Sequence, residues 1–171
     1  MKFARLILFL TFLLVFPYQL KSDEIKKLPS EHEYNFYSGM FDFSDDGKKS
    51  ALFGFQHQNE NLTRDSFFGT ISPITGALIT ADNAAYFYTG VQAQYKIGKF
   101  DLTPSFTPGF YEKGSGKDLG HALEFKTEVQ LSLNLFENSQ FGMSYNHISN
   151  ASLGDKNPGA NSYMFNFLQK F

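Results

Sequence analysis

Residues 123–135, LEFKTEVQLSLNL, alternate between a mostly apolar set of side chains and a polar set over thirteen positions. Because successive side chains of a strand point to opposite faces, this pattern predicts a β-strand with one apolar face and one polar face. At about 3.3 Å per residue the strand would be roughly 40 Å long, which exceeds the usual strand of a soluble sheet. Its polar face carries Glu124, Lys126 and Glu128, which the core of a soluble sandwich would not bury cheaply. A soluble sheet could turn that face to water, so this strand alone leaves both classes open.

The same period of two recurs along the chain. Residues 87–97 alternate in the same way, and the C-terminal segment places Tyr163, Phe165, Phe167 and Phe171 on one parity. Helical periodicity is not evident in any of these segments. Shorter segments of similar character lie near 34–43, 50–59, 66–79, 99–111 and 139–149, with boundaries defined to about two to four residues. The sequence therefore predicts eight strands.

The composition is rich in aromatic residues without being apolar on average. Aromatic residues make up 18% of the 171 positions although Trp is absent, and the mean hydropathy is -0.27. Intrinsic disorder is excluded because disordered chains are poor in aromatic residues. A bundle of membrane helices is excluded because it requires several apolar runs of about 20 residues.

The charge balance and the cysteine count exclude further classes. A formal net charge of -2 gives no reason to expect a nucleic-acid partner. The absence of cysteine excludes a disulfide scaffold, a thiolate zinc site and a cysteine nucleophile. No pair of the four histidines has the spacing of metal ligands, so we expect neither a metal nor another cofactor.

The N-terminal segment, residues 1–22, predicts a signal peptide. Lys2 and Arg5 provide a positive start, residues 6–16 form an almost unbroken apolar run, and Ser22 is a small residue suited to cleavage. The alternative is a membrane anchor, but the run is shorter than the roughly 20 residues that a spanning helix requires. Residues 23–171 would then form one exported domain.

Eight two-faced strands in an exported chain of this length fit the smallest barrel of the outer membrane of a Gram-negative bacterium. We therefore expect an all-β fold, an eight-stranded antiparallel transmembrane β-barrel whose closure leaves no strand edge in hydrocarbon. Side chains fill the interior of so small a barrel, which predicts an internal ion-pair network of Lys96, Glu124, Lys126 and Glu128. A soluble exported sandwich or a lipocalin-like barrel, acting as a lipid carrier, is the alternative.

The connections predict the orientation of this barrel. With both termini in the periplasm, the first, third, fifth and seventh strands run outward. The outer loops would then lie near 45–47, 80–85, 112–120 and 150–159, and the inner turns at 59–64, Gly98 and 137–138. Very short inner turns are typical of outer-membrane barrels.

The candidate chemistry lies at the outer end of the seventh strand. His147 and Ser149 are two residues apart, so they project from one face, and an imidazole near a hydroxyl is what a serine nucleophile requires. They share the parity of Tyr145 and therefore face lipid rather than the interior. Asn161 begins the eighth strand on the lipid-facing parity at the same height. The alternative is that all three are ordinary polar residues at a membrane interface.

The run from His147 to Ala151, followed by Asn157, Gly159 and Tyr163, resembles the outer-membrane lipid A 3-O-deacylase family (PagL-like, acyloxyacyl hydrolases). The motif-level match covers about the last 30 residues. The resemblance implies that lipid A, the anchor of lipopolysaccharide, is the substrate. It also implies that His147 is the catalytic base, Ser149 the nucleophile and Asn150 an oxyanion-stabilising residue, with no metal.

Asn161 departs from the pattern of the family that the chain resembles, which has a glutamate at this position. An asparagine can orient His147 but cannot stabilise its imidazolium by charge, and replacing the acid of a serine triad can cost about 10⁴ in turnover. Ser152 stands where the family often has glycine, and Asp155 in the same loop could substitute for the acid. We expect an esterase that removes a hydroxyacyl chain from lipid A. The alternative is a non-catalytic eight-stranded barrel, either a surface-binding protein or a degenerate family member.

Overall fold

The computed structural model describes residues 32–45 and 48–171, so the predicted signal peptide lies outside the described residues. Among the described residues, no helix is long and apolar enough to cross a membrane. One short 3-10 helix, η1 (Glu60–Leu62), follows the second strand. The strands are β1 (His32–Phe41), β2 (Ser50–Asn59), β3 (Arg64–Ser66), β4 (Gly69–Thr80), β5 (Ala85–Ile97), β6 (Phe100–Glu112), β7 (Leu123–Phe136), β8 (Ser139–Ser149) and β9 (Ala160–Lys170).

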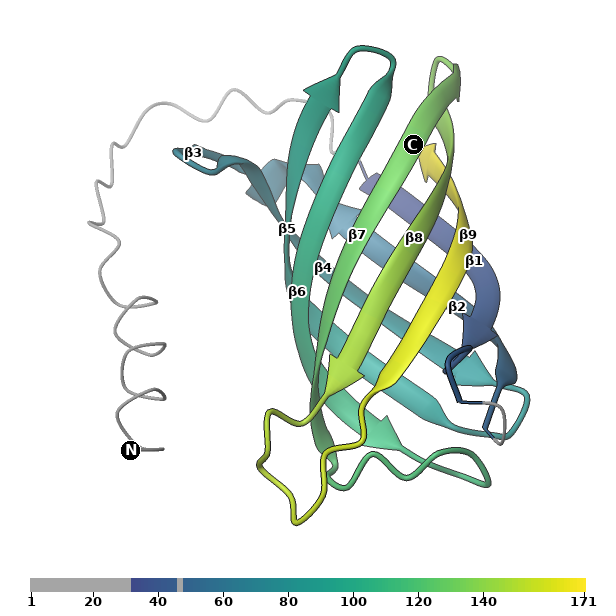
Figure 1. Ribbon diagram of the computed structural model, residues 1–171. Helices are drawn as coiled ribbons and strands as arrows, with labels where there is room; N and C mark the ends of the chain where they lie inside the picture. The colour runs from purple at the N-terminus through teal and green to yellow at the C-terminus, as the bar shows by residue number, and fades with distance from the viewer. Residues whose placement is uncertain (1–31, 46–47) are drawn as a thin grey trace.

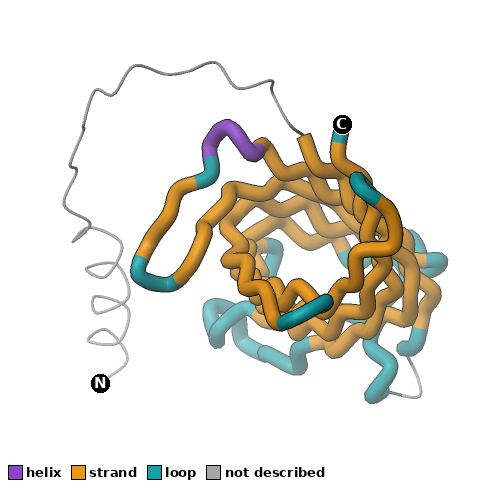
Figure 2. Tube along the Cα trace, turned by 90° about the horizontal axis from the view of Figure 1, so that it is seen from above, coloured by secondary structure: helices purple, strands orange, loops and turns teal. Residues whose placement is uncertain are grey.

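Eight of these strands close into an antiparallel barrel, seen from the side in Figure 1 and along its axis in Figure 2. The order of neighbours is β2-β1-β9-β8-β7-β6-β5-β4, and the pairing of β2 with β4 completes the ring. The short β3 pairs only with β4, outside this ring. The predicted fold class is confirmed, because each two-faced segment forms a strand of the closed barrel.

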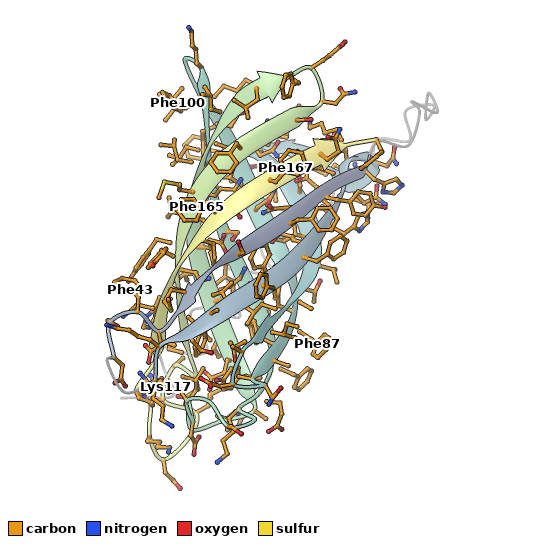
Figure 3. The ribbon with its side chains drawn as sticks, turned by 90° about the vertical axis from the view of Figure 1, so that its right-hand side faces the viewer. Phe43, Phe87, Phe100, Lys117, Phe165 and Phe167 are labelled. Carbon is orange, nitrogen blue, oxygen red and sulfur yellow. The ribbon has the colours of Figure 1, made fainter. Side chains whose placement is uncertain are left out.

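One face of each strand lies on the outer wall and the other lines the interior, as the alternation of side chains predicted. Large apolar side chains are exposed on the outer wall, among them Phe53, Phe87 and Phe110. Figure 3 shows Phe165 and Phe167 on the outside of β9 in the same way. The interior combines buried polar groups with a cluster of apolar and aromatic side chains that come mainly from the ends of strands. Its members are Tyr37, Phe41, Leu52, Leu78, Ala84, Tyr86, Tyr88, Tyr111, Leu119, Ile148, Ala160 and Met164.

The expected internal ion-pair network is reduced to one pair. Lys126 is fully buried in the barrel. Its Nζ lies 2.7 Å from Oε2 of Glu128 and 4.0 Å from the centre of the Tyr88 ring. Glu124 is buried but belongs to none of the ion pairs among the described residues. Lys96 is exposed near the end of β5, where water solvates it, so its predicted place in the network is wrong.

The connections lie at two distinct ends of the barrel. The loop end carries the connections 42–49, 81–84, 113–122 and 150–159, as predicted for the outer side. The turn end carries the C-terminus and two tight turns, at 98–99 and 137–138 (Figure 1).

The third connection at the turn end differs from the predicted simple turn at 59–64. The chain passes through η1 and β3 before β4 begins at Gly69, three residues after the start of the predicted segment 66–79. The reason is that β3 pairs with the first residues of β4, with Ser66 opposite Gly69, and makes a separate hairpin. Gly69 has a φ of 89°, a backbone conformation that glycine adopts at little cost.

Candidate active site

The pairing of β8 with β9 brings two of the candidate residues side by side. His147 lies directly opposite Asn161, and Tyr145 lies opposite Tyr163. On β8 the side chains of Ser144, Asn146 and Ile148 are buried in the barrel. The alternate residues Tyr145, His147 and Ser149 therefore stand on the outer wall near the loop end, where His147 and Ser149 are half-buried.

Three hydrogen bonds hold the His147–Asn161 pair. Nδ1 of His147 lies 2.8 Å from Oδ1 of Asn161, and the hydroxyl of Tyr145 donates to the same oxygen at 2.8 Å. The Nδ2 of Asn161 donates to Oγ of Ser44 at 3.1 Å. Because the carbonyl oxygen of Asn161 is an acceptor, a neutral imidazole that makes this hydrogen bond carries its proton on Nδ1. Nε2 is then unprotonated and able to take a proton.

Gly159 lies against the other edge of the imidazole. A Cβ at this position would stand 2.7 Å from Cε1 and 3.2 Å from Nε2 of His147, closer than side-chain carbons normally approach. The residue also has a φ of 64°, which glycine tolerates best. Any larger side chain would press on the ring, so Gly159 fixes how closely the 150–159 loop approaches His147.

Ser149 is the last residue of β8, with Phe125 of β7 opposite it. The Phe125 ring stacks on Phe106 with centres 6.0 Å apart, so the wall beside Ser149 is apolar. Within the described residues no hydrogen bond joins His147 to Ser149, although both project from one face of the strand. Such contacts between base and nucleophile are often longer in enzymes without substrate.

Asn150 is fully buried and connects β8 to two loops. Its Nδ2 donates to the backbone carbonyls of Leu119 at 2.8 Å and Lys156 at 2.9 Å. Its Oδ1 accepts from the backbone N–H of Ser152, and its own N–H donates to Oδ1 of Asn157. Both side-chain amide hydrogens are therefore used to hold the loops together, and the turn at Ala151 and Ser152 that follows has φ values of 52° and 65°.

The β1–β2 loop covers the site from the side of β9. Phe43 donates its backbone N–H to the carbonyl of Asn161, and its ring packs against the rings of Tyr145 and Tyr163. Figure 3 shows Phe43 on the outer wall toward the end of the barrel where Lys117 lies. Sequence reasoning missed Ser44 and Phe43, because only the pairing of β1 with β9 brings their loop to the site. It also missed the hydroxyl of Tyr145 as a donor to Asn161, because that contact depends on the register of β8 with β9.

Charged side chains join the loops around the site. Lys117 is largely buried, with its Nζ 2.6 Å from Oδ2 of Asp42 and 3.3 Å from Oδ2 of Asp45. Asp118 pairs with Lys156 at 2.9 Å and with Lys113 at 3.5 Å. The hydrogen bond from Lys156, with a second from the Gly120 N–H, lowers the pKa of Asp118 to about 2.

No carboxylate of the described residues pairs with His147. Asp155, the substitute acid that the sequence suggested, is exposed and takes part in no ion pair among these residues. The described residues also hold no group of three or more side chains able to bind a metal ion. His32 and His57 do meet, with Nδ1 and Nε2 2.9 Å apart on β1 and β2. The sequence did not reveal this pair because it depends on strand register.

The chain as a whole resembles a known family of proteins. The model of the PagL lipid A 3-O-deacylase family matches residues 37–168 of the chain. The chain belongs to this family. Members act on lipid A in the outer membrane, and the family's barrel places the chain in the outer membrane of a Gram-negative bacterium. A comparison with curated proteins gives no significant match.

Solved structures agree on the fold. The crystal structure of the outer-membrane enzyme PagL has a TM-score of 0.61 with 15% sequence identity, covering 80% of this chain and 98% of that chain. A de novo designed transmembrane β-barrel has a TM-score of 0.55 with 10% identity, covering 85% and 98%. At these identities the likeness concerns the barrel and not the residues of the site.

Proposed function

We propose that this member of the family is an esterase that removes an ester-linked hydroxyacyl chain from lipid A. The observation that carries the proposal is the hydrogen bond of Nδ1 of His147 to Asn161 on the lipid-facing wall. It leaves Nε2 free to act as a base toward Ser149, two residues along the same face. Substrate in the outer leaflet would reach this wall without leaving the membrane.

The reaction follows from these positions. Oγ of Ser149 attacks the ester carbonyl carbon while Nε2 of His147 takes the hydroxyl proton. Collapse of the tetrahedral intermediate breaks the ester bond, and His147 returns the proton to the leaving sugar oxygen. Water then attacks the acyl-Ser149 ester with the same proton transfers. The products are a free hydroxy fatty acid and a lipid A that lacks one chain.

Stabilisation of the oxyanion is assigned to the turn after Ser149, whose conformation Asn150 fixes through its hydrogen bonds. The side-chain hydrogens of Asn150 are donated to loop carbonyls, so the residue acts by fixing the turn after Ser149. In that turn the backbone N–H of Ala151 has no hydrogen-bond partner among the described residues, and it is a suitable donor to an oxyanion. Preorganised backbone donors cost no reorganisation when charge develops.

Asn161 supports a second candidate function, a non-catalytic barrel derived from the family. The described residues offer no carboxylate to stabilise the imidazolium of His147, which weakens a serine hydrolase. Against this candidate, the amide of Asn161 is held by three side chains with its oxygen toward the imidazole. Asn161 therefore orients the imidazole, which is one of the two roles of the acid in a serine triad.

Mass spectrometry of lipid A separates these functions. Cells that express the protein should contain lipid A lighter by one hydroxyacyl chain, and cells that express Ser149→Ala should not. Asn161→Glu serves as the companion variant. Activity that appears only in Asn161→Glu would show that the natural chain is degenerate, and identical lipid A in all strains would refute the esterase.

A further inference from the structure

The β3 hairpin forms an aromatic projection at the turn end of the barrel. We call residues 60–69 the wing: η1, β3 and the turn into β4. Phe67 at its tip is 96% exposed, Phe68 is 51% exposed, and their rings form an edge-to-face pair with centres 5.3 Å apart. Leu62 adds a further exposed apolar side chain. Exposed aromatic pairs of this kind are costly in water and commonly mark a contact surface.

The wing extends sideways from the barrel wall and not along the barrel axis, as Figures 1 and 2 show. It is held at a fixed height, because the hydroxyl of Tyr95 on β5 donates to the backbone carbonyl of Phe68. Tyr95 and Ile97 are themselves exposed on the outer wall at the end of β5. The apolar tip is therefore continuous with the part of the wall that faces lipid at the turn end.

The turn end is the periplasmic end, because outer-membrane barrels have short turns there and longer loops outside. The wall around Tyr95 then corresponds to the aromatic belt at the inner leaflet. Arg64 lies beside the tip, with its guanidinium exposed and donating to the carbonyls of Asn61 and Thr63. A cation next to apolar rings is the combination that suits a phospholipid headgroup and the acyl chains below it.

We propose that the wing inserts Phe67 and Phe68 into the phospholipid surface of the inner leaflet and acts as a second membrane contact outside the barrel wall. The pairing of β3 with β4, with Arg64 opposite Ile71, uses the backbone groups on one edge of the hairpin and keeps the tip in a defined conformation. Gly69, at φ 89°, lies so close to Tyr95 that a Cβ there would stand 3.0 Å from the ring, which allows the base of the wing to pack on this side chain.

Tryptophan fluorescence tests this contact directly, because the natural chain has no tryptophan. Phe67→Trp in the full-length protein gives a single reporter in phosphatidylcholine vesicles. Two matched reporters are Phe87→Trp on the lipid-facing wall and Ser115→Trp in an exposed loop. Each is measured with iodide in the water and with lipid brominated on the acyl chain.

Phe67→Trp should follow the wall reporter: blue-shifted emission, quenching by brominated lipid at least twofold stronger than for Ser115→Trp, and protection from iodide. Quenching by iodide alone, as in Ser115→Trp, would overturn the proposal. Blue-shifted emission that does not respond to brominated lipid but changes with the protein-to-lipid ratio would also overturn it. That result would mean that a second copy of the chain covers the tip.

Discussion

Nδ1 of His147 and Oδ1 of Asn161 lie 2.8 Å apart on directly paired positions of β8 and β9. The same oxygen accepts a hydrogen bond from the hydroxyl of Tyr145, and the amide nitrogen is held by Ser44. The imidazole is therefore oriented by a neutral group with a fixed rotamer. Among the described residues no carboxylate pairs with this imidazole, so the neutral Asn161 orients His147 without stabilising its imidazolium by charge.

Asn161→Glu should raise turnover by between about 10-fold and 10⁴-fold, the range over which the triad acid contributes in serine hydrolases. The site can accept the carboxylate, because the hydroxyls of Tyr145 and Ser44 can each donate to it. Asn161→Ala should lower turnover, because the imidazole loses its acceptor. Release of hydroxy fatty acid by purified protein measures both variants. A carboxylate that leaves turnover unchanged would mean that Asn161 does not occupy the position of the acid.

Tyr145→Phe should lower kcat by about 3-fold to 10-fold, the equivalent of one neutral hydrogen bond at the Asn161 oxygen. The matched control is Tyr163→Phe. The Tyr163 ring also packs on Phe43, but its hydroxyl makes no hydrogen bond within the described residues. Steady-state kinetics with KM determined separately is the measurement. Equal losses in the two variants would show that the effect comes from ring packing.

Gly159→Ala should abolish most of the activity, because the new methyl group would stand 2.7 Å from Cε1 of His147 and displace the ring. Gly98→Ala separates this effect from backbone strain. Both glycines have a φ of 64°, but a Cβ at Gly98 meets nothing within 4 Å. Each variant should lose about 1–2 kcal/mol of stability from the left-handed backbone. Only Gly159→Ala should lose activity, and equal activity in the two would contradict the contact.

Asp118→Asn should weaken the contact between the 113–122 and 150–159 loops at neutral pH but not in strong acid. The pKa of Asp118 is lowered from 3.8 to about 2 in the folded protein by its hydrogen bonds from Lys156 and Gly120. Its contribution to stability is thus complete above pH 3.8 and is lost as the pH falls through about 2. Urea unfolding of both proteins at several pH values should show a difference that shrinks across this interval. High salt should also reduce the difference, because the pair is exposed. A difference that stays constant with pH would contradict the assignment.

Lys126→Met should destabilise the barrel by about 3–5 kcal/mol, because it leaves the charge of Glu128 buried without its partner. The double variant Lys126→Met with Glu128→Gln should recover most of that loss, since no unpaired charge remains. Urea unfolding in detergent micelles measures both. A single variant as stable as the natural protein would show that the pair is solvated.

Local alternation was sufficient to predict the eight strands of the barrel and their outward faces. Residues 123–135 and 139–149 form β7 and β8 within a few residues, since a period of two is imposed by the strand itself. The same parity predicted that His147, Ser149 and Asn161 stand on the outer wall, where the structure has them. Their chemical roles came from the resemblance to the family and remain part of the proposal.

Contacts between distant strands could not be predicted in this way. Ser44 reaches Asn161 because β1 closes the barrel against β9, and His32 meets His57 only in the register of β1 with β2. Alternation also did not separate β3 from β4, since Ser66 and Gly69 face each other across a turn made possible by one glycine. Barrel closure and strand register depend on the whole sheet, so short sequence patterns do not predict which distant residues meet.

The most direct test of the account is the release of hydroxy fatty acid from purified lipid A by the purified, refolded protein. The natural chain should release one hydroxy fatty acid per lipid A, and Ser149→Ala, folded to the same heat-modifiable species on gels, should release none. Release by Ser149→Ala equal to that of the natural chain would contradict the assignment of the nucleophile. If the natural chain, Ser149→Ala and Asn161→Glu all fail to release hydroxy fatty acid, that result would contradict the proposed activity itself.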